Sequence, residues 1–218
     1  MRGARTIAPL LLAVAPFGLL FGALATRLGF SPLAALAISL LLFAGASQFV
    51  FVQLAAAGVP LGVVVAACAV VNLRHLLYSV SLAPRLEGLR QASRALASYL
   101  LTDEAYAVTI RAAAGEAAPS WFFIGAGVTL WGCWQLSTLV GAVIGTSLPP
   151  SPLYAFTLPL TFVAIVAPQL RDRAAIATAV VAGVVGVAGS PLPLGTGLIV
   201  ASMAAIAVGS IVERKKAS

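Results

Sequence analysis

The sequence predicts an all-α protein, a polytopic transmembrane helical bundle with about seven or eight membrane-crossing segments. Of its 218 residues, 61% are apolar and only 9% are Asp, Glu, Lys or Arg, whereas a soluble domain carries about 25% charged residues. The few charges are also unevenly spaced, because the stretches 28–73 and 117–170 contain none. A helix needs about 20 apolar residues to cross a bilayer. Each of these stretches therefore has room for two crossings.

Residues 1–218 are expected to form a single integral membrane domain in which apolar runs alternate with turns rich in Gly and Pro. The expected spans are 7–25, 33–54, 61–84, a weaker 99–113, 121–147, 153–167 and 174–212, with breaks near 72–75 and at 189–193. Similar small-residue patterns near 22–33 and 141–153 suggest two repeats, about 7–113 and 120–212. Transporters often place their sites at broken helices in matching positions of repeats. The alternative is that alanine-rich helices resemble one another by chance.

The net charge of +7 indicates basic loops that orient a membrane protein rather than a nucleic-acid partner. Lys and Arg collect in cytoplasmic loops and set the orientation of the chain. With eight crossings, both termini are expected in the cytoplasm, which would leave Arg27, Arg85, Arg90 and Arg94 outside. The first apolar run is long enough to span, so we expect an uncleaved first helix rather than a signal peptide.

Asn72, Arg74 and His75 interrupt the third expected span and are the first candidates for a substrate-binding or coupling site. Ionisable groups inside a helical bundle are costly and are therefore functional candidates by default. The guanidinium of Arg74 suits a carboxylate because it can donate two hydrogen bonds at once. His75 can exchange a proton near neutral pH. The alternative is that the span ends here and that Arg74 and His75 lie at the lipid headgroups.

Asp103 and Glu104 are the second candidates, expected in the middle of the weaker span. A buried carboxylate there could bind a substrate ammonium, or take up a proton because loss of water favours the neutral form. The alternative is an amphipathic helix at the membrane surface with a wet acidic face. Gln48 is the last candidate, because an amide inside an apolar span must find a hydrogen-bond partner. It would serve either helix packing or a pocket wall.

The chain is not expected to be an enzyme, because the usual enzyme signatures are missing. One histidine excludes the HExxH zinc motif, and the sequence contains neither GxSxG nor a P-loop. It also lacks the Cys/His clusters that hold metals, so no cofactor or metal is expected. Paired polar residues in a small helical bundle are typical of a secondary transporter or a transport subunit.

Three motifs resemble the AzlC family: Phe-Ala-Gly-Ala-Ser-Gln-Phe at 43–49, Asn-Leu-Arg-His-Leu-Leu-Tyr-Ser at 72–79, and Leu-Thr-Asp-Glu at 101–104. Their order and spacing fit along nearly the whole chain, and Asn-Leu-Arg-His is the most specific element. The resemblance implies a multi-pass protein of the bacterial cytoplasmic (inner) membrane, of a family implicated in exporting branched-chain amino acids. It also implies a small, separately encoded membrane partner of the AzlD type. It carries over no agreed set of binding residues.

On this basis the chain is expected to be a subunit of a secondary transporter that exports leucine, isoleucine and valine, coupled to a proton or to the membrane potential. Arg74 would take the substrate carboxylate, and Asp103 or Glu104 the ammonium. Two alternatives stay open. The first is a non-transporting membrane scaffold, and the second is a passive small-solute channel in which Gln48 and Asn72 line a wet pore.

Overall fold

The computed structural model describes residues 2–113, 120–147, 163, 170, 172–192 and 196–217, and every regular element in these residues is a helix. The all-α prediction is therefore confirmed. The chain divides into two compact units, Met1–Ser151 and Pro152–Ser218, which are described one at a time. The candidate site residues all belong to the first unit.

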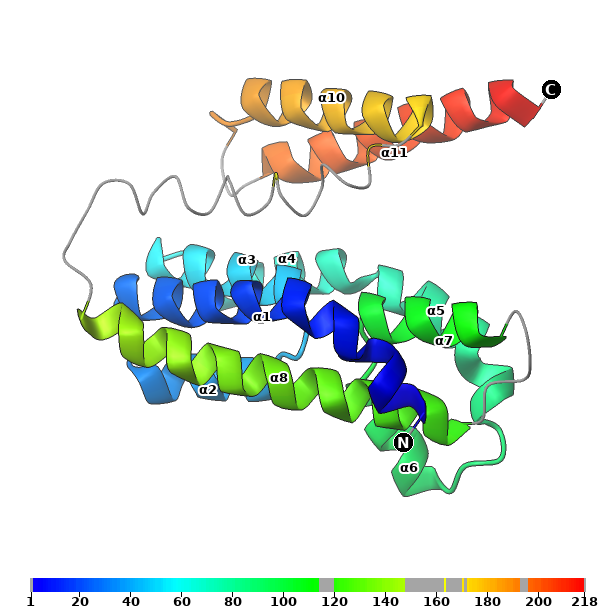
Figure 1. Cartoon of the computed structure of the whole chain (residues 1–218). Coiled ribbons are helices and arrows are strands. Elements are labelled where there is room, and N and C mark those ends of the chain that lie inside the picture. Colours follow the sequence, from blue (N-terminus) through cyan, green and yellow to red (C-terminus); the bar gives the residue numbers. More distant parts are fainter. Residues whose placement is uncertain are drawn as a thin grey trace. The chain divides into compact units, whose positions relative to one another are not determined.

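Two long helices, α1 (Arg2–Arg27) and α8 (Ser120–Ser147), form the spine of the first unit. They run parallel and in contact along their length: Gly3 packs on the backbone of Phe122, and Gly22 packs on the backbone of Thr138. In Figure 1 both helices start at the same end of the unit. Small residues let helix backbones approach this closely. Both helices are long and apolar enough to cross a bilayer.

A third rod consists of two helices, α4 (Leu61–Asn72) and α5 (Arg74–Leu86), which meet at Leu73 with a bend of 46°. The predicted break in the third span is therefore confirmed. The carbonyl of Arg85, near the end of α5, accepts a 2.7 Å hydrogen bond from Ser120 at the start of α8. This rod thus runs antiparallel to α1 and α8. Counted as one broken span, it is the third candidate crossing among the described residues.

The predicted span 33–54 is wrong as one continuous helix, because the chain turns back at residues 42–44. Helix α2 (Pro32–Leu41) starts beside the end of α1, and its Ser31 hydroxyl caps the backbone N–H of Ala34. Helix α3 (Gly45–Ala56) then runs antiparallel to α4. The Ser47 hydroxyl at the start of α3 donates to the side-chain carbonyl of Asn72 at the end of α4, at 2.8 Å. Helices α2 and α3 therefore form a hairpin that enters from the end of the unit marked by Arg27.

The weaker predicted span 99–113 forms a short helix preceded by a turn and does not cross the unit, which is the alternative that a count of seven crossings left open. Helix α6 (Gln91–Tyr99) leads inward from the end marked by Arg85, and the chain turns at residues 100–102. Helix α7 (Asp103–Ala113) then runs parallel to α5, because Asp103 pairs with Arg74 and, further along, Tyr106 donates to the Ser81 hydroxyl at 3.1 Å. It therefore returns to the end from which α6 came. The described residues of the first unit thus form three rods and two helical hairpins that enter from opposite ends.

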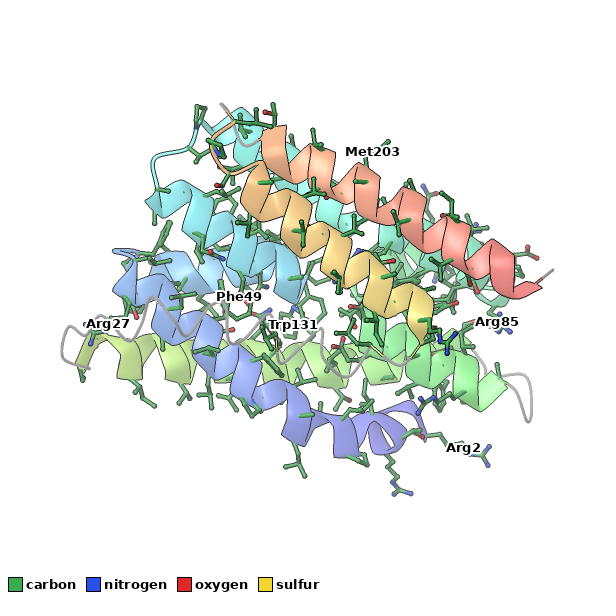
Figure 2. All side chains as sticks on the ribbon, turned by 90° about the horizontal axis from the view of Figure 1, so that it is seen from above. Arg2, Arg27, Phe49, Arg85, Trp131 and Met203 are labelled. Carbon is green, nitrogen blue, oxygen red and sulfur yellow. The ribbon has the colours of Figure 1, made fainter. Side chains whose placement is uncertain are left out.

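The arginines of the first unit are distributed unevenly between its two ends. Figure 2 shows Arg2 and Arg85 on one side and Arg27 on the other. Arg90 lies in the turn after α5, and Arg111 lies in the last turn of α7, at the same end as Arg85. The predicted arrangement, with Arg85, Arg90 and Arg94 at the same end as Arg27, is therefore wrong. It followed from counting the first hairpin, formed by α2 and α3, as a crossing.

The second unit contains α10 (Arg173–Ala188) and α11 (Thr196–Ala217). Asp172 caps the start of α10 with a 2.7 Å bond from the backbone N–H of Ala175. The helix ends before Gly189, as the predicted break requires, and the backbones of Gly189 and Gly197 lie in contact. Apart from Val163, the predicted span 153–167 falls outside the described residues. The two repeats and the count of seven or eight crossings stay predictions.

Candidate functional site

Three helix breaks meet at mid-depth in the first unit, and each is followed by one of the predicted site motifs. Gln48 lies in the first turn of α3, Arg74 and His75 start α5, and Asp103 and Glu104 start α7. The hairpin tips touch each other: the Tyr99 hydroxyl donates to the carbonyl of Leu40 at 2.6 Å, and the rings of Phe43 and Tyr99 are 5.9 Å apart.

Arg74 and Asp103 form the central contact of this site. The guanidinium Nη1 of Arg74 donates to Oδ2 of Asp103 at 2.8 Å, and the two side chains are 35% and 38% exposed. The Arg74 Nε and the Asp103 Oδ1 are both buried and have no hydrogen-bond partner among the described residues. The pair therefore keeps one donor and one acceptor free. The sequence named both residues, but their pairing across two helices emerges only from the structure.

Asp103 and Glu104 occupy the first turn of α7 rather than the middle of a helix, which corrects the prediction. The Thr102 hydroxyl caps this helix by accepting from the backbone N–H of Ala105 at 3.3 Å. Carboxylates are favoured at a helix N-terminus, where unpaired N–H groups give a partial positive charge. Glu104 interacts with the Thr102 side chain and lies within electrostatic reach of Arg74. The local sequence thus turns both carboxylates toward the break.

Asn72 and His75 hold the break between α4 and α5. The Nδ1 of His75 lies 3.2 Å from the backbone carbonyl of Asn72; since a carbonyl only accepts, this nitrogen carries the proton. The ring thus satisfies a carbonyl that the break releases. The side chain of Asn72 accepts from Ser47 instead, which ties the break to the tip of the first hairpin.

Gln48 is fully buried, and its amide holds the tip of the first hairpin. Its Nε2 donates to the carbonyl of Leu42 at 2.6 Å, and its Oε1 accepts from the indole N–H of Trp134 at 3.1 Å. A second buried amide, Gln135, donates to the carbonyl of Ser39 at 3.2 Å. These bonds satisfy carbonyls at the end of α2. The contacts of Gln48 correspond to the packing alternative.

Sequence reasoning did not single out two tyrosines beside the ion pair. The rings of Tyr78 and Tyr106 stack with centroids 4.4 Å apart, and His75 meets Tyr78 edge to face at 5.8 Å. The side chain of Tyr78 also interacts with the Asp103 carboxylate, and Tyr78 lies within electrostatic reach of Arg74. Helical spacing was the sequence signal that could have identified them. Tyr78 follows Arg74 by four residues and Tyr106 follows Asp103 by three, which places each pair on one helix face.

The described residues contain no group of three His, Cys, Asp or Glu side chains that could hold a metal ion. The site therefore offers one cation, two carboxylates, an imidazole and two phenol rings. Such a set can hold a small ligand that carries both charges, or it can exchange protons between neighbouring groups.

Long apolar helices, a broken rod and charged residues at its break together define a helical membrane protein. A family model described as AzlC protein matches residues 9–148, which include most of α1, the helices from α2 to α8 and every candidate site residue. The chain belongs to the AzlC family, as its motifs predicted.

Two relatives extend the comparison. The chain is 35% identical over 152 residues to "Inner membrane protein YgaZ" of Escherichia coli strain K12, covering 68% of this chain and 62% of that protein. It is 32% identical over 201 residues to an uncharacterized membrane protein of Archaeoglobus fulgidus, covering 90% and 87% of the two chains. The chain thus spans less than two thirds of the length of the first relative. No solved structure matches it.

Proposed function

We propose that this chain is a secondary transporter subunit that exports branched-chain amino acids across the bacterial cytoplasmic membrane with a small AzlD-type partner. The observation that carries the proposal is the Arg74–Asp103 pair at a helix break, with a free donor on Arg74 and a free acceptor on Asp103. An amino acid zwitterion carries the complementary groups, a carboxylate and an ammonium. The branched-chain specificity and the partner come from the family resemblance.

The chemistry of substrate binding follows from the free atoms of the pair. The substrate carboxylate accepts from the Arg74 guanidinium, and its ammonium donates to the Asp103 carboxylate. The empty site holds its two charges together, so that neither is left alone inside the bundle, where an unpaired charge is costly. The substrate thus binds the atoms that the ion pair leaves free.

The two hairpins supply a physical basis for alternating access. They enter from opposite ends, and their tips meet beside the ion pair. Discontinuous helices that meet at the bilayer midplane form the substrate sites of many secondary transporters. In this proposal one hairpin covers the site from each side, and withdrawal of either tip opens the site to that side only.

Export against a gradient needs a driving force, which we assign to the proton or to the membrane potential. Moving one charge through 100 mV supplies about 2.3 kcal/mol, which is equivalent to a gradient of roughly fifty-fold at RT of about 0.59 kcal/mol. Asp103 and Glu104 are the carboxylates that could carry the proton.

The test is efflux of labelled leucine, isoleucine and valine from vesicles under an imposed pH gradient, with this chain alone and with its partner. We expect saturable efflux that responds to the gradient and is lost in Asp103→Asn. Non-saturable flux that ignores the gradient would indicate the passive channel instead. No flux under any condition, from vesicles that contain folded protein and its partner, would contradict transport and favour the scaffold.

A further inference from the structure

We infer that the cavity between α5, α6 and α8 is a water-filled vestibule in which Arg94 binds the carboxylate of an amino acid with an apolar side chain, before the substrate reaches Arg74 and Asp103. This inference rests on the proposed function for the identity of the substrate. The cavity itself, its position and its chemistry are features of the structure.

The cavity has a volume of about 190 Å³, which equals roughly six water molecules at about 30 Å³ each. Its floor is apolar: Leu82 of α5 and Phe123 of α8 are each 1% exposed, and Leu101 is also buried. Its rim carries the exposed side chains of Ser79, Ser98 and Arg94. An apolar floor with a few polar groups at the rim is the usual make-up of a small-molecule site.

The position of the cavity connects one end of the unit to the ion pair. The lining residues of α5 and α6 follow helical spacing, so each helix presents one face to the cavity. Leu101 lies two residues before Asp103, and Ser79 follows the Tyr78 that contacts the pair. At the other end, Arg94 lies one turn into α6, beside the turn that follows α5. The cavity thus leads from the arginine-rich end toward the candidate site.

Arg94 is a cation without a carboxylate partner among the described residues, whereas Arg74 is paired. A guanidinium at the mouth of an apolar cavity favours an anionic head with an apolar body, because the two parts of the ligand meet matching surfaces. A branched-chain amino acid has this shape, with its carboxylate at the rim and its side chain on the floor.

Cysteine labelling tests the vestibule without requiring transport. Cys68 and Cys133 are replaced by Ala, since both are free thiols, and Ser79→Cys is compared with Val80→Cys. Val80 is 74% exposed but does not line the cavity. In vesicles with the arginine-rich end outward, a membrane-impermeant sulfonate thiol reagent should modify the cysteine at position 79. The cysteine at position 80 should stay unmodified, because it would face hydrocarbon, where the reactive thiolate does not form. Equal labelling of both positions, or labelling of neither, would overturn the vestibule.

Protection by ligands tests the role of Arg94. Leucine should slow labelling at position 79 several-fold, and leucinol, which lacks the carboxylate, should not. Arg94→Gln should raise the half-protecting leucine concentration about tenfold, the effect of losing one charge-assisted hydrogen bond. Arg90→Gln is the matched control, because Arg90 precedes α6 and does not line the cavity. This variant should leave the half-protecting leucine concentration unchanged. Protection by leucinol as strong as by leucine, or equal effects of the two arginine variants, would overturn carboxylate binding by Arg94.

The labelling experiment and the efflux experiment test the vestibule and the proposed function separately. If leucine protects position 79 but no efflux occurs, the vestibule stands and the transporter assignment fails. If efflux occurs and is lost in Asp103→Asn while position 79 stays unprotected, the transporter assignment stands and the vestibule is overturned.

Discussion

At the scale of single residues, the Arg74–Asp103 pair makes the sharpest prediction about substrate recognition. Arg74→Lys keeps the charge but removes the planar fork that presents Nη1 to Asp103 and Nε to a ligand. We expect the half-saturating leucine concentration to rise about tenfold or more, which corresponds to at least about 1.4 kcal/mol, with the protein still folded. The half-saturating concentration is measured from the dependence of efflux on leucine concentration. Arg111→Lys, at the far end of α7, is the control. Equal apparent affinity in the parent protein and Arg74→Lys would remove Arg74 from the substrate path.

A second prediction at this scale concerns Gln48. Gln48→Leu leaves the buried indole N–H of Trp134 without its partner and removes one of the two donors to the carbonyl of Leu42. A buried polar group left unsatisfied costs about 1–3 kcal/mol. We expect a clear drop in the thermal unfolding temperature in detergent. Gln53→Leu is the matched control, because its half-buried amide bonds only the carbonyl of Phe49 in its own helix. Equal unfolding temperatures for the two variants would show that the hairpin tip does not depend on Gln48.

The sequence predicted the residues of the site better than their arrangement. Asn72, Arg74, His75, Asp103 and Glu104 stood out because polar groups are rare in this apolar chain. Their convergence could not be predicted, since the partner of Asp103 lies on another helix. The signal that Asp103 starts a helix was present, because Thr102 followed by two acidic residues is a common helix start, but the apolar run around it favoured a span.

At the scale of elements, the break in α4–α5 was predictable and the hairpins were not. Polar residues interrupt the third rod in the sequence itself, whereas residues 33–54 read as one apolar run. The turn at 42–44 depends on Gln48 and on Trp134, which comes from α8. Long-range contacts therefore decide a backbone path that local hydropathy cannot reveal.

The spine of α1 and α8 gives a prediction about packing. Gly141→Leu places a side chain against the backbone of Leu19, whereas Gly132 in the same helix has open space around it. Backbone cannot yield as a flexible side chain can, so we expect Gly141→Leu to abolish the monodisperse folded protein, as seen by size-exclusion chromatography. Gly132→Leu should behave like the parent. A Gly141→Leu protein that elutes and melts normally would mean that α1 and α8 do not touch at this point.

At the scale of the whole molecule, the hairpins determine which loops share a side of the membrane. Because α2 and α3 return to the end they started from, Phe30 and Gly58 should lie on one side, and Arg90 and Trp121 together on the other. Single cysteines at these four positions, labelled with an impermeant reagent from each side, measure this directly. If Phe30 and Gly58 are labelled from opposite sides, residues 33–54 cross the membrane after all.

The same geometry predicts an orientation in the membrane. Six arginines (Arg2, Arg5, Arg85, Arg90, Arg94 and Arg111) belong to the end where α1 and α8 start, and Arg27 belongs to the other. Under the positive-inside rule we expect the arginine-rich end to face the cytoplasm. The vestibule would then open toward the compartment from which an exporter collects its substrate.

The contact between α1 and α8 has one more consequence. Gly22 packs on Thr138 and Ala142, and Gly141 packs on Leu19. When the sequences of the two helices are aligned so that Gly141 corresponds to Gly22, Thr138 corresponds to Leu19 and Ala142 to Ala23. The contact of Gly22 with Thr138 is then equivalent to the contact of Gly141 with Leu19. That is the isologous geometry of a two-fold symmetric dimer. The contact between α1 and α8 within one chain therefore has the geometry of a contact between two copies of a half-length protein.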